Sequence, residues 1–279
     1  RVPVLVTWAN TPTGRIDGVA AWKTQTVLVA ESAAAAASRS RFHAVTDGVA
    51  RTKCQELHVG SDRVRLAERG RDARRYQPAD KTTRDGVRTQ LGVNDSAEFL
   101  LLAVGRQEPQ KDYPLMVRAF DSAQDADVPA RLLIAGRTGA ASAQIQQAIA
   151  TVRFPDRIKL LGQREDVSDL LSAADAVVCS SKREGAAGSL IEAMAVGTPI
   201  VAVQLDGLEG VLEHEHNALV VPRTDLAAGI RRLARDPKLR RRLAEAGRTT
   251  FLERFTVERS ADALADVYRW AARPRRKPA

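Results

Sequence analysis

Short apolar runs alternate with longer amphipathic stretches over most of the chain. The run at 99–104 is continuously apolar, which is typical of a strand covered on both faces. Further short, mostly apolar runs, which also read as strands, stand at 131–135, 158–161, 176–180 and 200–203. The helices expected between these strands are 113–120, 142–152, 167–173 and 190–196. Such alternation at short spacing predicts an α/β fold with a doubly wound parallel sheet.

A shorter alternation precedes this part of the chain, and helical patterns follow it. The elements predicted before residue 77 are strands at 2–7, 42–46 and 64–67, a helix over the alanine run 33–37, and a helix over 47–57 capped by Asp47. Residues 77–97 are polar and charged without an apolar period, which marks a connection between units. The elements predicted after residue 203 are a strand at 219–222 and helices at 226–234, 238–253 and 257–270.

A glycine loop joins the predicted strands at 176–180 and 200–203. Residues 184–192 read EGAAGSLIE, in which Ser189 is a natural N-cap and Glu192, three residues later, would complete a capping box. Gly185 and Gly188 let the backbone approach a ligand closely, and the first-turn amides of the helix face that ligand. The loop therefore predicts a site for an anion the size of a diphosphate.

Two carboxylates bracket this anion site. Glu192 could be purely structural if it only completes the capping box. Glu184 lies upstream of the cap, where it would repel a phosphate unless it engages something else, such as sugar hydroxyls. The pair suits a ligand that carries both phosphates and hydroxyl-bearing rings.

Other candidate residues follow the remaining predicted strands. Ligands of open parallel sheets bind at the carboxyl ends of the strands, and Gly105, Gly136, Gly162 and the loop containing Glu184 all fall there. Arg106 and Lys111 stand at the first of these ends. Taken alone they would be read as solvated loop cations. These positions predict one crevice.

The wording EG…SLIEAMAVGTPIVA, with its E-x7-E spacing, resembles glycosyltransferase family 4, the retaining enzymes of the GT-B fold. The resemblance extends from about Phe42 to Tyr268. It implies two Rossmann-like domains with parallel sheets, the first of them incomplete here. The chain opens on Arg1 at the threshold of an apolar strand, and we expect it to lack its true N-terminus and to transfer little sugar by itself.

The resemblance also implies roles for particular residues. Glu184 would face the donor sugar, Glu192 would bind the ribose hydroxyls, and Arg106 and Lys111 would clamp the donor diphosphate. The residues expected to be catalytic are Glu184, Arg106 and Lys111. The expected donor-binding set is Gly105, Arg106, Lys111, Gly162, Gln163, Arg164, Glu184, Gly185, Gly188, Ser189, Leu190 and Glu192.

No cofactor or metal is expected, and the nucleotide sugar is a substrate. Asp125 and Asp127 spell a DxD, but they fall away from the strand ends and are interpreted as a solvated loop. Two places depart from the family pattern. Ala9 stands where many members carry a histidine that reaches the donor sugar, and Arg-Gly-Arg-Asp at 69–72 replaces a usual Asn-Gly-Val-Asp turn.

The resemblance and the pattern together predict the domain organisation. The expected units are the end of the acceptor-side domain at 1–76, a linker at 77–95, the nucleotide-sugar domain at 96–254, a helix crossing back to the first domain at 255–272, and a basic tail at 273–279.

The composition of the chain favours some classes of function and argues against others. With 279 residues and 44% hydrophobic residues the chain can bury a substantial core, and no apolar run reaches the ~20 residues that span a bilayer. Cys54 and Cys179 have no metal-ligand spacing, so we expect a reducing cytoplasm. The net charge of +9 favours phosphates, including peripheral contact with an anionic membrane. Only 4% of residues are aromatic, which argues against nucleic-acid binding.

We therefore expect a retaining glycosyltransferase that uses a UDP-type nucleotide sugar and a glycan or lipid-linked acceptor, of the kind that builds cell-envelope polysaccharides. Three alternatives are a basic membrane- or nucleic-acid-binding module with a vestigial nucleotide site, a GT-B phosphorylase, and a nucleotide-sugar epimerase.

Overall fold

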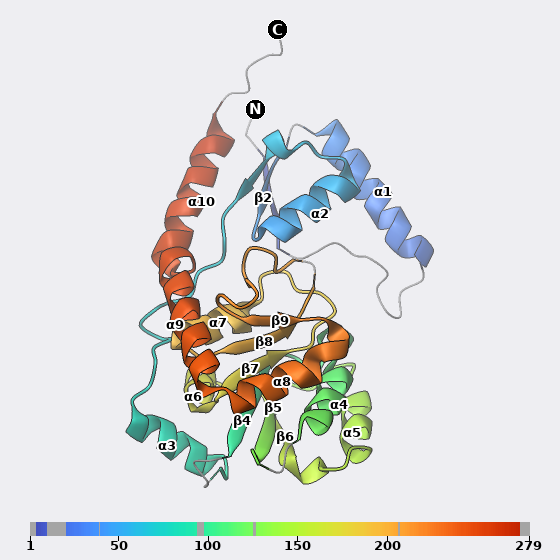
Figure 1. Ribbon diagram of the computed structural model, residues 1–279. Helices are drawn as coiled ribbons and strands as arrows, with labels where there is room; N and C mark the ends of the chain where they lie inside the picture. The colour runs from blue at the N-terminus through green and yellow to red at the C-terminus, as the bar shows by residue number, and fades with distance from the viewer. Residues whose placement is uncertain are drawn as a thin grey trace.

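The computed structural model describes residues 4–9, 21–38, 40–93, 98–124, 127–205 and 207–273. These residues form two separate sheets, one of three strands and one of six, with helices around both (Figure 1). Every strand pair in both sheets is parallel. The predicted α/β fold with two parallel sheets is thereby confirmed.

The small sheet has the order β1-β2-β3. Its strands are β1 (Leu5–Trp8), β2 (Arg41–Ala44) and β3 (Val64–Leu66), and its helices are α1 (Ala21–Ala37) and α2 (Asp47–Leu57). Trp8 stacks on Phe42 with 4.5 Å between ring centroids, and this pair lies in the core of the unit. Thr46, not Asp47 as predicted, caps α2, because Thr46 is extended and its hydroxyl accepts a hydrogen bond from the Val49 amide at 3.2 Å.

The large sheet has the order β6-β5-β4-β7-β8-β9. Its strands are β4 (Phe99–Val104), β5 (Ala130–Ala135), β6 (Ile158–Gly162), β7 (Ala176–Cys179), β8 (Ile200–Val203) and β9 (Leu219–Val221). Single turns of 3₁₀-helix precede β3, α4, β6 and α8, at Ser61–Arg63, Pro109–Lys111, Pro155–Arg157 and Arg223–Asp225. The strand order reverses at β4, so ligand-binding loops are expected where β4 and β7 end.

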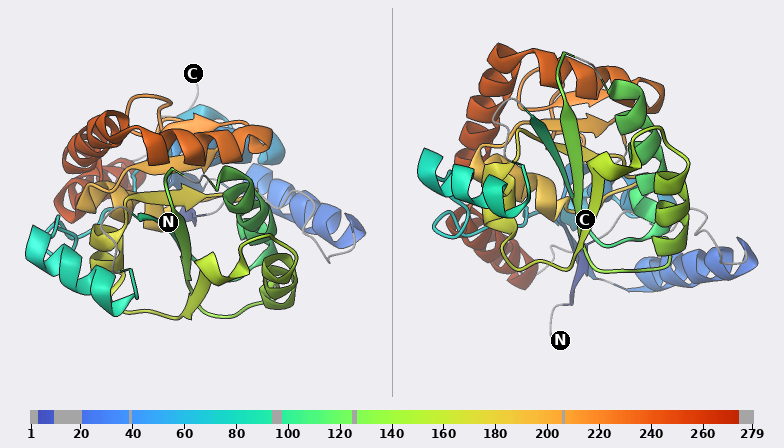
Figure 2. Two further views of the ribbon diagram at one scale, coloured as in Figure 1. Left: turned by 60° about the horizontal axis from the view of Figure 1, so that its bottom comes forward. Right: turned by 90° about the horizontal axis from the view of Figure 1, so that it is seen from below.

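Helices cover both faces of the large sheet (Figure 2). One face packs against α4 (Tyr113–Ala123), α5 (Ser142–Ala150) and α8 (Leu226–Arg235), and the other against α6 (Val167–Ala173) and α7 (Gly188–Val196). The long helix α9 (Pro237–Arg254) contributes Leu243 to the first core and Phe251 to the second. Since adjacent residues such as Leu101 and Leu102 enter opposite cores, β4 has no polar face. This burial on both faces explains the continuous apolar run at 99–104 in the sequence.

The polar connection between the sheets contains a helix that the sequence pattern did not predict, α3 (Lys81–Gln90). Asp80 caps it by accepting a hydrogen bond from the Thr83 amide at 2.7 Å. The helix packs beside α6, and charge helps to hold it there, because Arg84 and Arg88 both bind Asp175 just before β7, at 2.5 and 3.0 Å.

Helix α10 (Val257–Ala272) leaves the large sheet and runs beside the small one (Figure 1). The Trp270 ring lies near the guanidinium groups of Arg41 and Arg65, with centroid distances of 5.0 and 4.8 Å. Ser260 donates a hydrogen bond to the Glu68 carbonyl at 2.6 Å. None of the helices in the described part of the chain is both long and apolar enough to cross a bilayer.

Candidate functional site

The carboxyl ends of β4, β5 and β6 border an open cavity of about 370 Å³. Its lining residues are Val104, Gly105, Arg106, Ala135, Gly136, Arg137, Gln163, Arg164 and Val167. Four of these, at 105, 106, 163 and 164, were predicted as donor-binding from sequence. The structure therefore brings the loops of three successive strand ends to one hollow, which is the size of pocket that holds a small ligand.

Close contact between two of the strand ends shapes this hollow. A Cβ atom on Gly136 would lie 1.8 Å from the Gly105 carbonyl oxygen, so only glycine fits there. The Gly136 amide donates to the Gly162 carbonyl at 2.7 Å, and the Gly105 amide donates to the Ala135 carbonyl at 2.9 Å. These contacts lock the three loops together at the ends of the strands.

Lys111 and Glu184 meet beside the hollow, where β7 ends. The Lys111 Nζ lies 2.5 Å from the Glu184 Oε1, and the Glu184 side chain is only 9% exposed. Ser181 also donates a hydrogen bond to the same carboxylate oxygen at 2.6 Å. The residues expected to contact the donor diphosphate and the donor sugar are thus adjacent, and the Glu184 carboxylate has a fixed orientation.

The loops at Gly105 and Ser181 are held in place by three residues that the sequence analysis did not select, which are Tyr113, Arg223 and Asp112. Tyr113 donates a hydrogen bond to the Gly105 carbonyl at 2.8 Å, and burial raises the pKa of its phenol, which keeps the donor proton on. Arg223 donates to the carbonyls of Ser180 and Ser181, each at 3.2 Å, and pairs with Asp112. Because Arg223 lies two residues after β9 ends, the rule that sites lie at strand ends could have found it.

Helix α7 begins two residues earlier than its sequence signals indicate. Its N-cap is Ala187, in the left-handed region at φ 41°, and no side chain caps it. The predicted capping box of Ser189 and Glu192 does not form, so that structural interpretation of Glu192 is wrong. Glu192 instead accepts a hydrogen bond from Arg71 Nε at 2.7 Å. The reason is tertiary, since Arg71 comes from the segment that follows the small sheet.

Arg106 and Arg164 are less constrained than Lys111. The Arg106 side chain is 56% exposed, and its ion-pair partner among the described residues is Glu108 at 3.9 Å. Arg164 binds Asp166 at 2.8 Å, and this hydrogen bond lowers the pKa of the Asp166 carboxyl. The structure places Arg106 at the hollow without bringing it into contact with the pair of Lys111 and Glu184.

The sequence analysis also singled out the DxD at 125–127 and Ala9. Asp125 is outside the described residues, and Asp127 lies 3.7 Å from Arg235. Within the described ranges no group of three or more His, Cys, Asp and Glu side chains is arranged to hold a metal. Ala9 follows β1, and the next residues of its loop, 10–14, are outside the described part.

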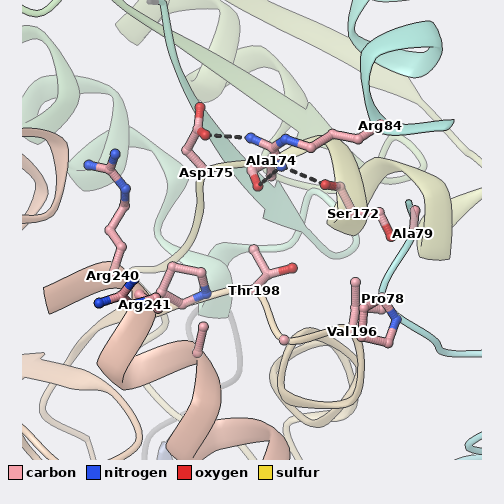
Figure 3. Close-up of a pocket in the computed structure, with 13 residues that line it drawn as sticks. Pro78, Ala79, Arg84, Ser172, Ala174, Asp175, Val196, Thr198, Arg240 and Arg241 are labelled. Carbon is pink, nitrogen blue, oxygen red and sulfur yellow. Dashed lines mark hydrogen bonds and ion pairs between the residues drawn. The ribbon is translucent and has the colours of Figure 1, made fainter. Parts of the chain in front are cut away.

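A second cavity, of about 290 Å³, lies at the opposite edge of the large sheet (Figure 3). Arg84 reaches across it to Asp175 and to the Ser172 carbonyl. Arg240 donates to the Ala234 carbonyl at 2.8 Å, in the last turn of α8. These arginines bind helix-end carbonyls and thereby act as caps. We interpret this cavity as part of the scaffold.

The sequence of the chain is similar to those of known proteins. The family model described as glycosyl transferases group 1 matches residues 88–250. The chain is 30% identical over 197 residues to the lipopolysaccharide core biosynthesis glycosyltransferase LpsD of Rhizobium meliloti, covering 70% of this chain and 54% of LpsD. It is also 30% identical over 235 residues to a D-inositol 3-phosphate glycosyltransferase of Streptomyces bingchenggensis, covering 79% and 51%.

The fold is shared with solved structures. Anabaena HepE, crystallised in complex with UDP and glucose, superposes with a TM-score of 0.85 at 21% identity, over 96% of this chain and 72% of HepE. This likeness concerns the fold, which is the two-sheet GT-B arrangement. The chain spans about half the length of the curated relatives it matches.

Proposed function

The chain belongs to the glycosyl transferases group 1 family, and from this premise we propose that it binds a nucleotide-diphosphate sugar in the hollow at the carboxyl edge of the large sheet. The activity proposed for the protein is transfer of that sugar, with retention at the anomeric carbon, to a glycan or lipid-linked acceptor. The observation that carries the proposal is the placement of both glutamates of the E-x7-E motif at this edge, each already bound to a cation, Glu184 to Lys111 and Glu192 to Arg71.

The proposed chemistry follows from charge. As the bond between the anomeric carbon and the phosphate oxygen breaks, negative charge grows on the departing diphosphate. Lys111, Arg106 and the first-turn amides of α7 stabilise that charge, because preorganised donors in a partly dry site are effective at such a point. Glu184 binds sugar hydroxyls and orients the anomeric carbon. The acceptor oxygen attacks from the side of the leaving group, and the phosphate takes its proton.

The similar proteins support a choice of nucleotide for the donor, but they differ in their acceptors. HepE binds UDP and glucose in its crystals, and we propose UDP as the nucleotide here. The named relatives act in lipopolysaccharide core biosynthesis and on D-inositol 3-phosphate, so their acceptors differ. The net charge of +9 is compatible with a lipid-linked acceptor at an anionic membrane surface, and we propose peripheral contact of that kind.

A thermal-shift panel tests the proposal with the chain as it stands. UDP, GDP, ADP and their sugars are compared with uridine at physiological salt. A ligand that binds only the folded state, at a hundred times its dissociation constant, adds about 2.7 kcal/mol of stability. We expect UDP and UDP-sugars to raise the melting temperature most.

Two results would contradict the proposal. One is a melting temperature that no nucleotide diphosphate changes at any accessible concentration. The other is stabilisation that is equal for all polyanions and disappears as salt is raised, which would indicate a basic binding module.

A further inference from the structure

Arg71 lies on the segment that joins the small sheet to the linker, and its backbone is fixed by α9 and α10. Its amide donates to the Phe255 carbonyl at 2.8 Å, and its carbonyl accepts from the Val257 amide at 3.0 Å. The preceding Gly70 packs against the same segment, since a Cβ there would lie 2.3 Å from the Thr256 carbonyl oxygen. The Arg71 side chain therefore projects from a firmly held position.

The Arg71 guanidinium lies on the first turn of α7. A Cβ atom on Gly188 would lie 2.2 Å from Arg71 Nη2, so the guanidinium lies directly against the backbone at 188 and would have to shift if a side chain were added there. Its Nε binds Glu192 at 2.7 Å, and the side chains of Arg71 and Glu192 are 27% and 15% exposed. Burial raises the pKa of the nearby Tyr76 phenol, and the charge of Glu192 raises it further.

This placement is electrostatically unusual. The amino end of a helix carries partial positive charge, so a guanidinium is repelled there unless an anion accompanies it. Glu192 supplies that anion in this structure. An anionic ligand bound by the first-turn amides of α7 would lie against Arg71, and it would compete with Glu192 for the same guanidinium.

We propose that Arg71 is an additional donor-binding residue, which exchanges Glu192 for the diphosphate when a nucleoside diphosphate binds. The inference rests on the proposed function. The exchange breaks the ion pair between Arg71 and Glu192 and replaces it with two new contacts. The Arg71 guanidinium then binds the diphosphate, and Glu192 is released to accept hydrogen bonds from the ribose hydroxyls. A nucleoside without phosphates must break the same ion pair for Glu192 to reach its ribose, but it offers Arg71 no phosphate to bind. Arg71 therefore favours the diphosphate over the bare nucleoside.

The test compares UDP and uridine binding to wild-type chain and to Arg71→Ala, by calorimetry for UDP and ligand-observed NMR for uridine. We expect the substitution to weaken UDP binding about 10- to 100-fold, as loss of a charge-assisted contact does. Uridine should bind as well as to wild type or better, because Glu192 is then already free. Arg71→Lys should recover part of the UDP affinity, since it restores the charge without the planar fork.

Controls separate this role from a structural one and from the proposed function. Arg74→Ala removes an exposed arginine three residues away and should leave both affinities unchanged. Equal losses for UDP and uridine in Arg71→Ala would mean that Arg71 only supports the fold, and unchanged UDP affinity would also overturn the inference. If UDP binding depends on Lys111 but not on Arg71, this inference alone is wrong. If wild-type chain binds no UDP, the proposed function is wrong.

Discussion

Replacing Asp175 with alanine should lower the free energy of unfolding by about 3–5 kcal/mol, the range for removing one partner of a buried ion pair. The Asp175 carboxylate accepts from Arg84 at 2.5 Å, from Arg88 at 3.0 Å and from the Leu100 amide at 2.7 Å. Arg88 is 5% exposed and would remain buried with its charge uncompensated. Chemical denaturation monitored by circular dichroism measures the change.

The contrast with two other variants shows whether burial is the cause. Arg84→Ala should cost less than Asp175→Ala, because the Arg84 side chain is 30% exposed and Asp175 keeps Arg88. Asp262→Ala removes an exposed carboxylate from α10 and should be close to neutral. A loss below about 1 kcal/mol for Asp175→Ala would show that α3 is not anchored by this cluster.

Replacing Lys111 with methionine should weaken UDP binding by about 10- to 150-fold, which corresponds to about 1.5–3 kcal/mol for a lost charge-assisted contact. The structure adds a second effect. Glu184, with its side chain 9% exposed, would keep the Ser181 hydroxyl as its one hydrogen-bond donor among the side chains that the structure describes. We therefore expect stability to fall as well, by about 1–3 kcal/mol. Calorimetry and thermal denaturation measure the two effects separately.

Matched variants assign the two effects to their causes. Arg106→Ala should weaken UDP binding without lowering stability, because its side chain is 56% exposed. The double variant Lys111→Met with Glu184→Gln should regain stability, since no charge is left unpaired, and should still bind UDP weakly. Lys238→Met, at an exposed lysine of α9, should change neither quantity. Wild-type UDP affinity in Lys111→Met would remove Lys111 from the site.

The large sheet could be predicted because its short apolar strands alternate with amphipathic helices at regular short spacing, and its central strand β4 is buried on both faces. Helix α3 could not, because Val87 is the sole apolar side chain in the helix that packs on the core, and it is joined to the sheet by Arg84 and Arg88. An apolar period cannot report a helix that docks through ion pairs.

The candidate site was predictable in part for the same reason. Residues that follow parallel strands meet at the same edge of the sheet, however the rest of the chain packs. The loops at 105, 136, 162 and 184 could therefore be grouped from sequence. The start of α7 could not be predicted, because Glu192 is held by Arg71, 121 residues earlier in the chain. Local capping rules describe an isolated helix, and here a distant guanidinium overrides them.

The central claim is that the carboxyl edge of the large sheet binds a nucleoside diphosphate through its phosphates and its ribose together. A calorimetric titration of the wild-type chain with UDP at physiological salt, followed by the same titration of Glu192→Gln, tests it most directly. We expect saturable binding of one UDP per chain, and affinity at least about tenfold lower in Glu192→Gln, because the charge-assisted ribose contact is lost. Equal affinity of the two proteins for UDP, or binding that never saturates at one site, would contradict it.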